Sequence, residues 1–381
     1  MKIAIWTVIP NHYQSAFHGA LRRLGADTHV VYFGEVPAER RALGWKSVSR
    51  SELLENESFW DPSLDLMENV PAWRERVHVV PGGRTGFLRS LARRLTENGV
   101  DWVHWSEPSS PGWKRLAGAP IRYWHALQVN RHALGAFGTG PLAMDDLRRW
   151  GMDRFRIASL PYVVAPSEHE YFADTGLDSP PTYLYVGQLC HRKGIDVLLR
   201  AFREVLHCIP SARLVVAGTD HSGGLYQGIA NALAITQQTT FTGAIPIDGI
   251  RALIRSASVL VLPSRFDGWG VVLSEAAAEG LALIATDMCG AAYGLIESGF
   301  NGYVVGAGSV QQLAAAMKAY ARDPASVLRH GRRSRILSSH FAPDRVAATF
   351  LETVTAWRAL GRRASMRVPG QLRSAHFAGG E

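Results

Sequence analysis

Two carboxylates in the C-terminal half are spaced so that one falls on a loop and the other inside a helix. Asp267 begins a glycine-rich turn, and Glu275 follows eight positions later in an apolar run. The residues that open the turn and start the helix are Gly268, Trp269, Gly270 and Val271. Glycines leave the backbone exposed, so the first amides of this helix can present its positive dipole end to an anion. A diphosphate bound there would bring a ribose diol near Glu275 and sugar hydroxyls near Asp267.

Two weaker signals precede this turn. The stretch from Gly187 to Gly194 runs from a strand end into a helix, and its Arg192 and Lys193 can hold an anion beside the helix N-terminus. A second strand ends in residues whose backbone can read the edge of a base, namely Gly243, Ala244 and Ile245. Each signal has a simpler interpretation, because an Arg-Lys pair at a turn is usually solvated and a glycine after a strand is common in turns.

The chain lacks the common metal and thiol motifs. Cys190, Cys208 and Cys289 are widely spaced, and no His-Glu-x-x-His or Asp-x-Asp pattern occurs. We therefore expect small buried thiols, no disulfide and no bound metal. A nucleotide-diphosphate sugar is then expected as a co-substrate, without a further cofactor.

The chain is basic, with a formal net charge of +8 and clusters of arginine near residues 84–94, 329–335 and 358–373. Solvated helix faces are the simplest interpretation of these clusters, and attraction to anionic lipid headgroups or to a lipid-diphosphate acceptor is the alternative. Nucleic acid is not expected, since the clusters lack interleaved aromatic residues. The first residues read as a buried strand and no apolar run is long enough to span a bilayer, so we expect a cytoplasmic protein with a peripheral contact to the inner membrane face.

Short apolar strands alternate with amphipathic helices in both halves. Strands are predicted over 3–8, 28–33, 100–105, 121–124 and 158–164, and then over 182–186, 213–217, 239–242, 258–263, 282–286 and 302–305. This alternation predicts an α/β protein with two Rossmann-like doubly wound domains that face a central cleft. The predicted boundaries are 1–170 for the acceptor-side domain, 171–342 for the donor-side domain, 343–362 for a last helix that packs back on the N-terminal domain, and 363–381 for a loose tail.

The stretches 187–202, 241–245 and 263–303 resemble the retaining glycosyltransferase family 4, whose two-domain fold is called GT-B. That family carries a Glu, seven residues and a second Glu, followed by Ala and a helix of small residues. The resemblance is close over about residues 180–340 and looser in the N-terminal half. It implies that Glu275 binds the donor ribose and Lys193 the donor phosphates, with Arg192 sharing the second task.

Two positions depart from the family pattern. Asp267 stands where the first Glu is usual, and Gln188 stands where Arg often follows the glycine, which leaves the donor sugar open. The resemblance also implies a histidine after a central N-terminal strand that faces the donor sugar. The matching run makes His125 the candidate and His104 a weaker rival, although a lone histidine at a strand end is more often structural.

The resemblance implies transfer of a sugar, with retention of configuration and without a metal, to a hydroxyl of a glycan or lipid-linked acceptor in cell-surface polysaccharide assembly. A soluble small-molecule acceptor and a catalytically silent GT-B binding protein are the alternatives. An oxidoreductase is disfavoured, since no Gly-x-Gly-x-x-Gly follows a strand.

Overall fold

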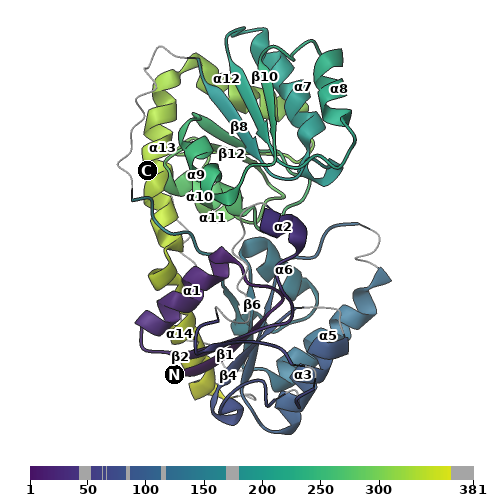
Figure 1. Cartoon of the computed structure of the whole chain (residues 1–381), viewed down its shortest axis with the longest axis vertical. Coiled ribbons are helices and arrows are strands. Elements are labelled where there is room, and N and C mark those ends of the chain that lie inside the picture. The colour runs from purple at the N-terminus through teal and green to yellow at the C-terminus, as the bar shows by residue number, and fades with distance from the viewer. Residues whose placement is uncertain are drawn as a thin grey trace.

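The structure is a computed structural model that describes residues 1–42, 53–61, 63–65, 67–82, 86–112, 117–168 and 180–361. These residues form two α/β domains that follow one another along the long axis of the molecule (Figure 1). Each domain has its own parallel sheet, so the predicted fold class of two Rossmann-like doubly wound domains is confirmed. The predicted boundary at residues 170 and 171 and the predicted tail from residue 363 lie outside the described residues.

Seven parallel strands form the N-terminal sheet, in the order β3-β2-β1-β4-β5-β6-β7. Their bounds are β1 Lys2–Thr7, β2 Asp27–Tyr32, β3 Glu57–Phe59, β4 Val77–Pro81, β5 Trp102–Ser106, β6 Gly135–Gly138 and β7 Ile157–Ser159. The connecting helices are α1 His12–Arg23, α2 Ala38–Ala42, α3 Gly86–Glu97, α5 Ala119–His132 and α6 Pro141–Arg149. Both faces of the sheet are covered, because buried clusters of apolar side chains lie on each side of it.

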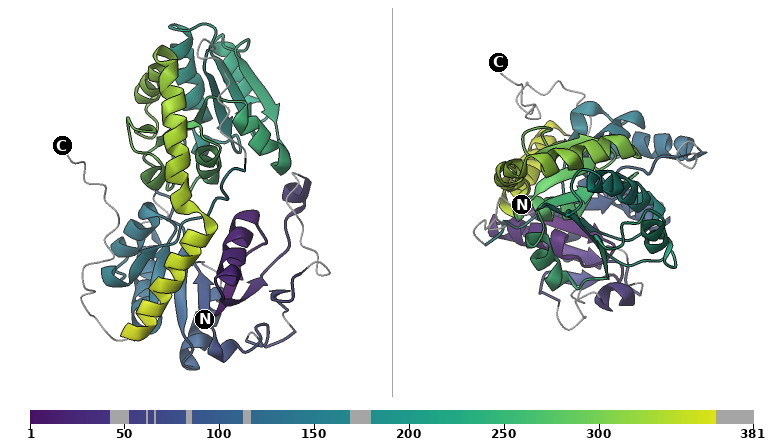
Figure 2. Two further views of the ribbon diagram at one scale, coloured as in Figure 1. Left: turned by 90° about the vertical axis from the view of Figure 1, so that its left-hand side faces the viewer. Right: turned by 90° about the horizontal axis from the view of Figure 1, so that it is seen from above.

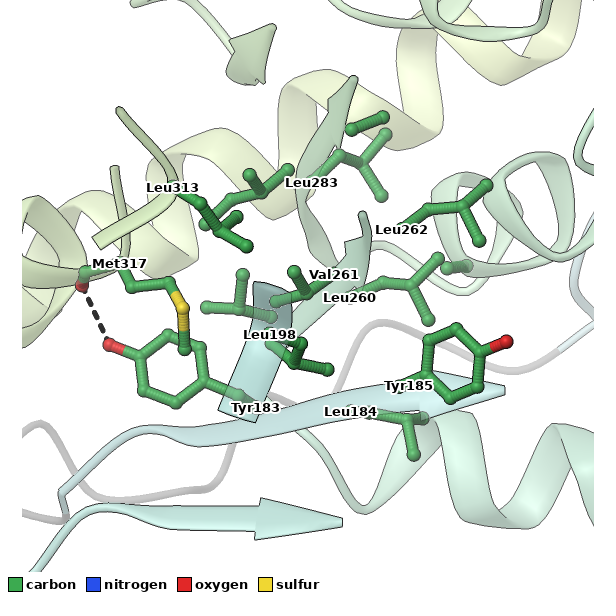
Figure 3. Packing of buried hydrophobic residues seen from close by; sticks show 14 of the residues in the cluster. Tyr183, Leu184, Tyr185, Leu198, Leu260, Val261, Leu262, Leu283, Leu313 and Met317 are labelled. Carbon is green, nitrogen blue, oxygen red and sulfur yellow. Dashed lines mark hydrogen bonds between the residues drawn. The ribbon is translucent and has the colours of Figure 1, made fainter. Parts of the chain in front are cut away.

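Six parallel strands form the C-terminal sheet, in the order β10-β9-β8-β11-β12-β13. Their bounds are β8 Thr182–Val186, β9 Arg213–Ala217, β10 Thr239–Gly243, β11 Val259–Leu262, β12 Ala282–Thr286 and β13 Gly302–Val305. The helices are α7 Ile195–Leu206, α8 Leu225–Ala232, α9 Ile247–Arg255, α10 Val271–Ala278, α11 Ala292–Leu295, α12 Val310–Arg322 and α13 Pro324–Ser338. Figure 3 shows the core of this domain, where Leu198, Leu260 and Leu283 pack together and the Tyr183 hydroxyl donates to the Met317 carbonyl at 2.7 Å.

The strand order reverses at equivalent places in the two domains. The reversal falls between β1 and β4 in the N-terminal sheet and between β8 and β11 in the C-terminal sheet. In doubly wound folds, ligands bind beside such switch points at the carboxyl ends of the strands. The turns that follow β8 and β11 are the two turns that the sequence singles out for phosphate binding.

The last helix, α14 Pro343–Leu360, connects the C-terminal domain back to the N-terminal one (Figure 2). Its Phe350 ring meets the Phe17 ring edge-on at 5.6 Å, and its Trp357 ring lies 4.8 Å from that of Phe137. Both of its rings are buried in the N-terminal core. The helix therefore contributes to the stability of the domain that it reaches from the other end of the chain.

One predicted strand is wrong. Residues 121–124 lie in α5, where Pro120 occupies the first turn, Ala126 and Val129 face the core, and Tyr123 and Trp124 are exposed. A short run of apolar and aromatic residues fits a strand or one turn of a helix equally well, and here the flanking residues continue the helix in both directions.

The cysteines also differ from expectation. Only Cys289 is buried, whereas Cys190 is half-buried and Cys208 is exposed. Among the described residues, no helix is both long and apolar enough to cross a bilayer.

Candidate active site

The turns after β8 and β11 are held against each other by glycine. Gly194 has a positive φ of 73°, and a Cβ at this position would lie 2.1 Å from the carbonyl oxygen of Pro263. The Arg265 amide donates to the Arg192 carbonyl at 2.8 Å across the same contact. No side chain can be added at Gly194 without separating the two turns, so the glycine is required where it stands.

Lys193 and Asp267 meet where these turns join. The Lys193 ammonium and the Asp267 carboxylate form an ion pair, and both side chains are mostly buried, with 15% and 13% of their surface exposed. The neighbouring Arg192 is exposed and donates to the Phe266 carbonyl at 2.9 Å. The structure therefore brings together three of the predicted side chains, and it pairs Lys193 with Asp267, for which separate roles were predicted.

The loop that precedes α10 is fixed by the backbone of residues 288–291. The Asp267 amide donates to the Met288 carbonyl at 2.9 Å, and the Ala291 amide donates to the Trp269 carbonyl at 2.8 Å. Gly270, at the N-terminus of α10, has a φ of 89°, and a Cβ there would lie 2.6 Å from the Cys289 sulfur. The loop is thus rigid, and it leaves the first turn of α10 half-exposed at Val271.

The indole of Trp269 points away from any anion at this helix end. Its ring is buried, its Nε1 donates to the Ser274 hydroxyl at 3.2 Å, and its centroid lies 5.8 Å from that of Phe341. A Cβ on Gly140, at the start of α6, would lie 2.5 Å from the same ring. Trp269 therefore joins the C-terminal loop to the N-terminal domain, and only its backbone is left to serve the predicted site.

Glu275 lies one turn into α10 and faces the other domain. The Tyr13 hydroxyl, at the start of α1, donates to its Oε1 at 3.4 Å. Burial raises the pKa of Glu275 to about 7, although the Arg251 guanidinium and the Tyr13 bond oppose this shift. Burial beside Glu275 also raises the pKa of the Tyr13 phenol well above its usual value. Tyr13 was missed as a partner because its loop carries no motif, and only proximity to Glu275 reveals it.

The remaining predicted backbone positions lie along the same edge of the sheet. Gly187 follows β8, and a Cβ on Gly218 would lie 1.8 Å from the Gly187 carbonyl oxygen. The Gly243 carbonyl accepts from the Gly218 amide at 2.8 Å, whereas Ala244 is exposed and Ile245 is half-buried. In the sheet order, β10 is two strands away from β8, so this backbone lies at the far side of the edge that carries Lys193.

The histidine candidates line a cavity of about 740 Å³ in the N-terminal domain. His104 is buried in β5 and His125 lies in α5, with ring centroids 5.0 Å apart. The expectation that His125 follows a central strand is wrong, because the run around it belongs to a helix. Burial lowers the pKa of both imidazoles, which favours their neutral forms at pH 7.

Glu107 connects this cavity with the C-terminal loop. It follows β5, lines the cavity and accepts from the Tyr162 hydroxyl at 2.6 Å. Its Oε2 lies 2.8 Å from where a Cβ on Gly268 would be. A molecule in the cavity would therefore meet the loop before α10 beside this carboxylate.

Comparison with known proteins identifies the C-terminal domain. Residues 167–336 match the family model described as glycosyl transferases group 1. Through these residues, which make up less than half of the chain, the C-terminal domain is similar to the glycosyl transferases group 1 family. The matched residues include all those predicted for the donor site, from Gly187 to Glu275, and none of those that line the N-terminal cavity.

Curated relatives of this chain include two transferases. The Streptomyces kanamyceticus alpha-D-kanosaminyltransferase is 27% identical over 217 residues, which cover 54% of this chain and 55% of that protein. The Mycobacterium leprae phosphatidyl-myo-inositol mannosyltransferase is 28% identical over 328 residues, which cover 78% of this chain and 84% of that protein. The chain spans about half the length of the first relatives that it matches, 55% of one and 46% of another.

The fold of this chain matches that of a solved structure. The crystal structure of Anabaena HepE in complex with UDP has a TM-score of 0.71 at 16% identity, covering 93% of this chain and all of that one. This likeness shows that the two domains have the GT-B arrangement.

Proposed function

We propose that the chain is a metal-independent, retaining glycosyltransferase that moves a sugar from a nucleotide-diphosphate sugar to a hydroxyl of a glycan or lipid-linked acceptor. The observation that carries this proposal is the convergence of Lys193, the N-terminus of α10 and Glu275 at the switch point of the C-terminal sheet. The match of residues 167–336 to the family model supports it, as does the UDP named with the HepE structure.

In this proposal the diphosphate lies against the first amides of α10. A helix N-terminus carries about half a positive charge, and Lys193 adds a full one. The Lys193–Asp267 pair holds the ammonium in place before the donor arrives, so little reorganisation is needed on binding. Glu275 then accepts hydrogen bonds from the ribose hydroxyls, and Arg192 supplies a second cation at the edge of the turn.

Retention of configuration follows if the acceptor attacks on the face from which the diphosphate leaves. The bond between the sugar carbon and the diphosphate oxygen breaks while the acceptor oxygen bonds to the same carbon. The departing oxygen takes the acceptor proton, so no protein base is required. The protein stabilises the charge that develops on the diphosphate and aligns the two substrates.

The acceptor side is assigned to the N-terminal domain. The named acceptor of the mycobacterial relative is a phosphatidyl-inositol lipid, which is consistent with a glycolipid acceptor here. The exposed arginines of α3 would favour an anionic membrane surface, and we place the reaction on its cytoplasmic side.

Thermal stabilisation by nucleotides tests the donor site. The purified protein is heated with UDP, GDP, ADP or dTDP, with and without magnesium. We expect one nucleotide to raise the Tm of the native protein equally in both conditions, and not to raise that of Glu275→Ala. Equal stabilisation of the Glu275→Ala variant would contradict the assignment of this carboxylate, and dependence on magnesium would contradict the metal-independent mechanism.

A further inference from the structure

The N-terminal cavity reaches the loop that precedes α10, called the donor loop below, at Gly268. All of its walls come from the N-terminal domain, and Glu107 stands where the cavity meets Gly268. A second cavity of about 580 Å³ shares Arg89, Trp124 and His125 with the first, and Glu107 does not line it. These three shared residues therefore lie where the two cavities adjoin, and Glu107 lines another part of the first cavity.

The end of the first cavity that adjoins the second cavity carries a positive charge. Arg89 projects from α3 and is exposed, and its charge contributes to the lowered pKa of His125. On the same helix, Arg93 pairs with Glu97 at 3.6 Å and Arg94 with Asp65 at 2.5 Å. Within the described part of the chain, no ion pair neutralises Arg89, which lines both cavities.

The wall between the two ends is fixed and partly aromatic. Arg122 bonds to the Ser109 hydroxyl and lies 5.1 Å from the Trp150 ring centroid. The Asp146 carboxylate accepts from the Ser109 amide at 2.9 Å. These charged groups serve the wall itself, whereas Trp124, with 55% of its surface exposed, offers an aromatic face to a sugar ring.

We propose that this cavity binds the acceptor and that the acceptor is a phosphorylated polyol. Its phosphate lies on the Arg89 guanidinium and an N–H of His125, its ring on Trp124, and its reacting hydroxyl beside Glu107 at the donor loop. The opposite charges at the two ends orient the molecule, since Glu107 repels the phosphate and accepts from a hydroxyl. The proposal rests on the proposed glycosyl transfer. A free sugar phosphate and a phosphodiester lipid headgroup share this chemistry.

Calorimetric titration with matched probes tests the proposal. Glucose 6-phosphate, glucose and inorganic phosphate are titrated into the native protein, Arg89→Ala and Arg94→Ala. We expect glucose 6-phosphate to bind at least tenfold more tightly than glucose, Arg89→Ala to lose at least tenfold in this affinity, and Arg94→Ala to retain it. Arg89→Lys should recover part of the loss, because it restores the charge without the planar fork.

A lipid arm separates the two sources of phosphate. Vesicles of phosphatidylglycerol are compared with vesicles of phosphatidylcholine in a flotation assay on the same variants. Binding to phosphatidylglycerol that requires Arg89 and not Arg94, with weak binding of the free sugar phosphate, would support the proposal and assign a headgroup. Equal behaviour of the two variants in both arms, or absence of binding in both, would overturn it.

Nucleotide binding keeps the two proposals apart. Arg89→Ala should bind the stabilising nucleotide as the native protein does, since Arg89 belongs to the other domain. If no phosphate binding depends on Arg89 while the nucleotide still binds, only the proposed acceptor site is contradicted. Phosphate binding without any nucleotide binding would instead remove the proposed donor site.

Discussion

The two domains share a strand order but build their sites from different parts of the chain. In the C-terminal domain, glycines bring backbone turns together at the ends of β8 and β11, and a few charged side chains complete the arrangement. In the N-terminal domain, the cavity is lined by side chains from helices α3, α5 and α6 and by β5 with the loop that follows it. A site made by backbone geometry constrains residue types tightly, whereas a site made by side chains on helices leaves them free to change with the ligand.

The domains also differ in what they bury. The N-terminal domain buries neutral histidines, and burial lowers the pKa of His18 to about 3 and those of His29 and His78 to about 4. In the C-terminal domain, His330 is the one buried histidine among the described residues, and burial lowers its pKa as well. The comparison predicts that acid destabilises the N-terminal domain first and that glycine substitutions harm the C-terminal site most.

Removal of the Lys193 charge should have the largest effect. Lys193→Ala leaves Asp267 without its partner, and in the proposed mechanism it removes a cation from the departing diphosphate. Loss of one such preorganised group commonly lowers the rate by ~10²–10³. The loss is measured as the rate of sugar transfer from the nucleotide-diphosphate sugar that contains the stabilising nucleotide. The far-ultraviolet circular dichroism spectrum checks that the variant is folded. A folded Lys193→Ala variant with the native rate would exclude Lys193 from the site.

Substitution of Gly194 should be the next largest. In Gly194→Ala, the new methyl meets the Pro263 carbonyl at 2.1 Å and the backbone keeps a positive φ, so we expect a loss of about 3 kcal/mol and weaker nucleotide binding. Gly223→Ala is the matched control, because Gly223 has a φ of 67° but no atom within 4 Å of the added carbon. It should cost about 1 kcal/mol and leave nucleotide binding unchanged. Equal losses from the two substitutions, measured by urea denaturation, would argue against a turn held by close contact.

Acid sensitivity should give the smallest effect. His18 is fully buried in α1, and neither ring nitrogen has a hydrogen-bond partner among the described residues. Its pKa of about 3 lies below the unfolded value, so the unfolded state binds the proton first and the free energy of unfolding falls as the pH drops below about 6.5. The loss due to His18 is about 2 kcal/mol at pH 5 and absent at pH 7.

Replacement of this imidazole by an apolar side chain removes the proton-binding difference. His18→Leu should therefore be about 2 kcal/mol less sensitive to a change from pH 7 to pH 5 than the native protein, as measured by urea denaturation at both values. His221→Leu, on the exposed surface of the C-terminal domain, is the control and should behave like the native protein. An unchanged pH dependence in His18→Leu would show that the buried imidazole does not contribute to acid sensitivity.

The difference between the domains explains what the sequence could predict. The glycine and carboxylate pattern from Gly187 to Glu275 indicated the C-terminal turns, because close backbone contacts admit few alternatives. The pairing of Lys193 with Asp267 was not predictable, since it depends on two turns that lie 74 positions apart. Nor was the bond from Tyr13 to Glu275, which forms between domains.

The N-terminal domain was predicted only at the level of its architecture. No strand was predicted at β3, β4 or β6. The run that contains His125 was read as a strand because its aromatic residues suit one, but these residues are exposed on α5. Glu107 and Arg89 carry no motif, and their relation to the cavity depends on the packing of three helices.

Hydrogen exchange with and without the stabilising nucleotide tests the central claim most directly. The account predicts protection of amides in the turns 187–194 and 265–275 of the C-terminal domain, with little change around the cavity that His125 lines. Protection confined to the N-terminal domain, or stabilisation by the nucleotide without protection of these two turns, would contradict a donor site at the switch point between β8 and β11.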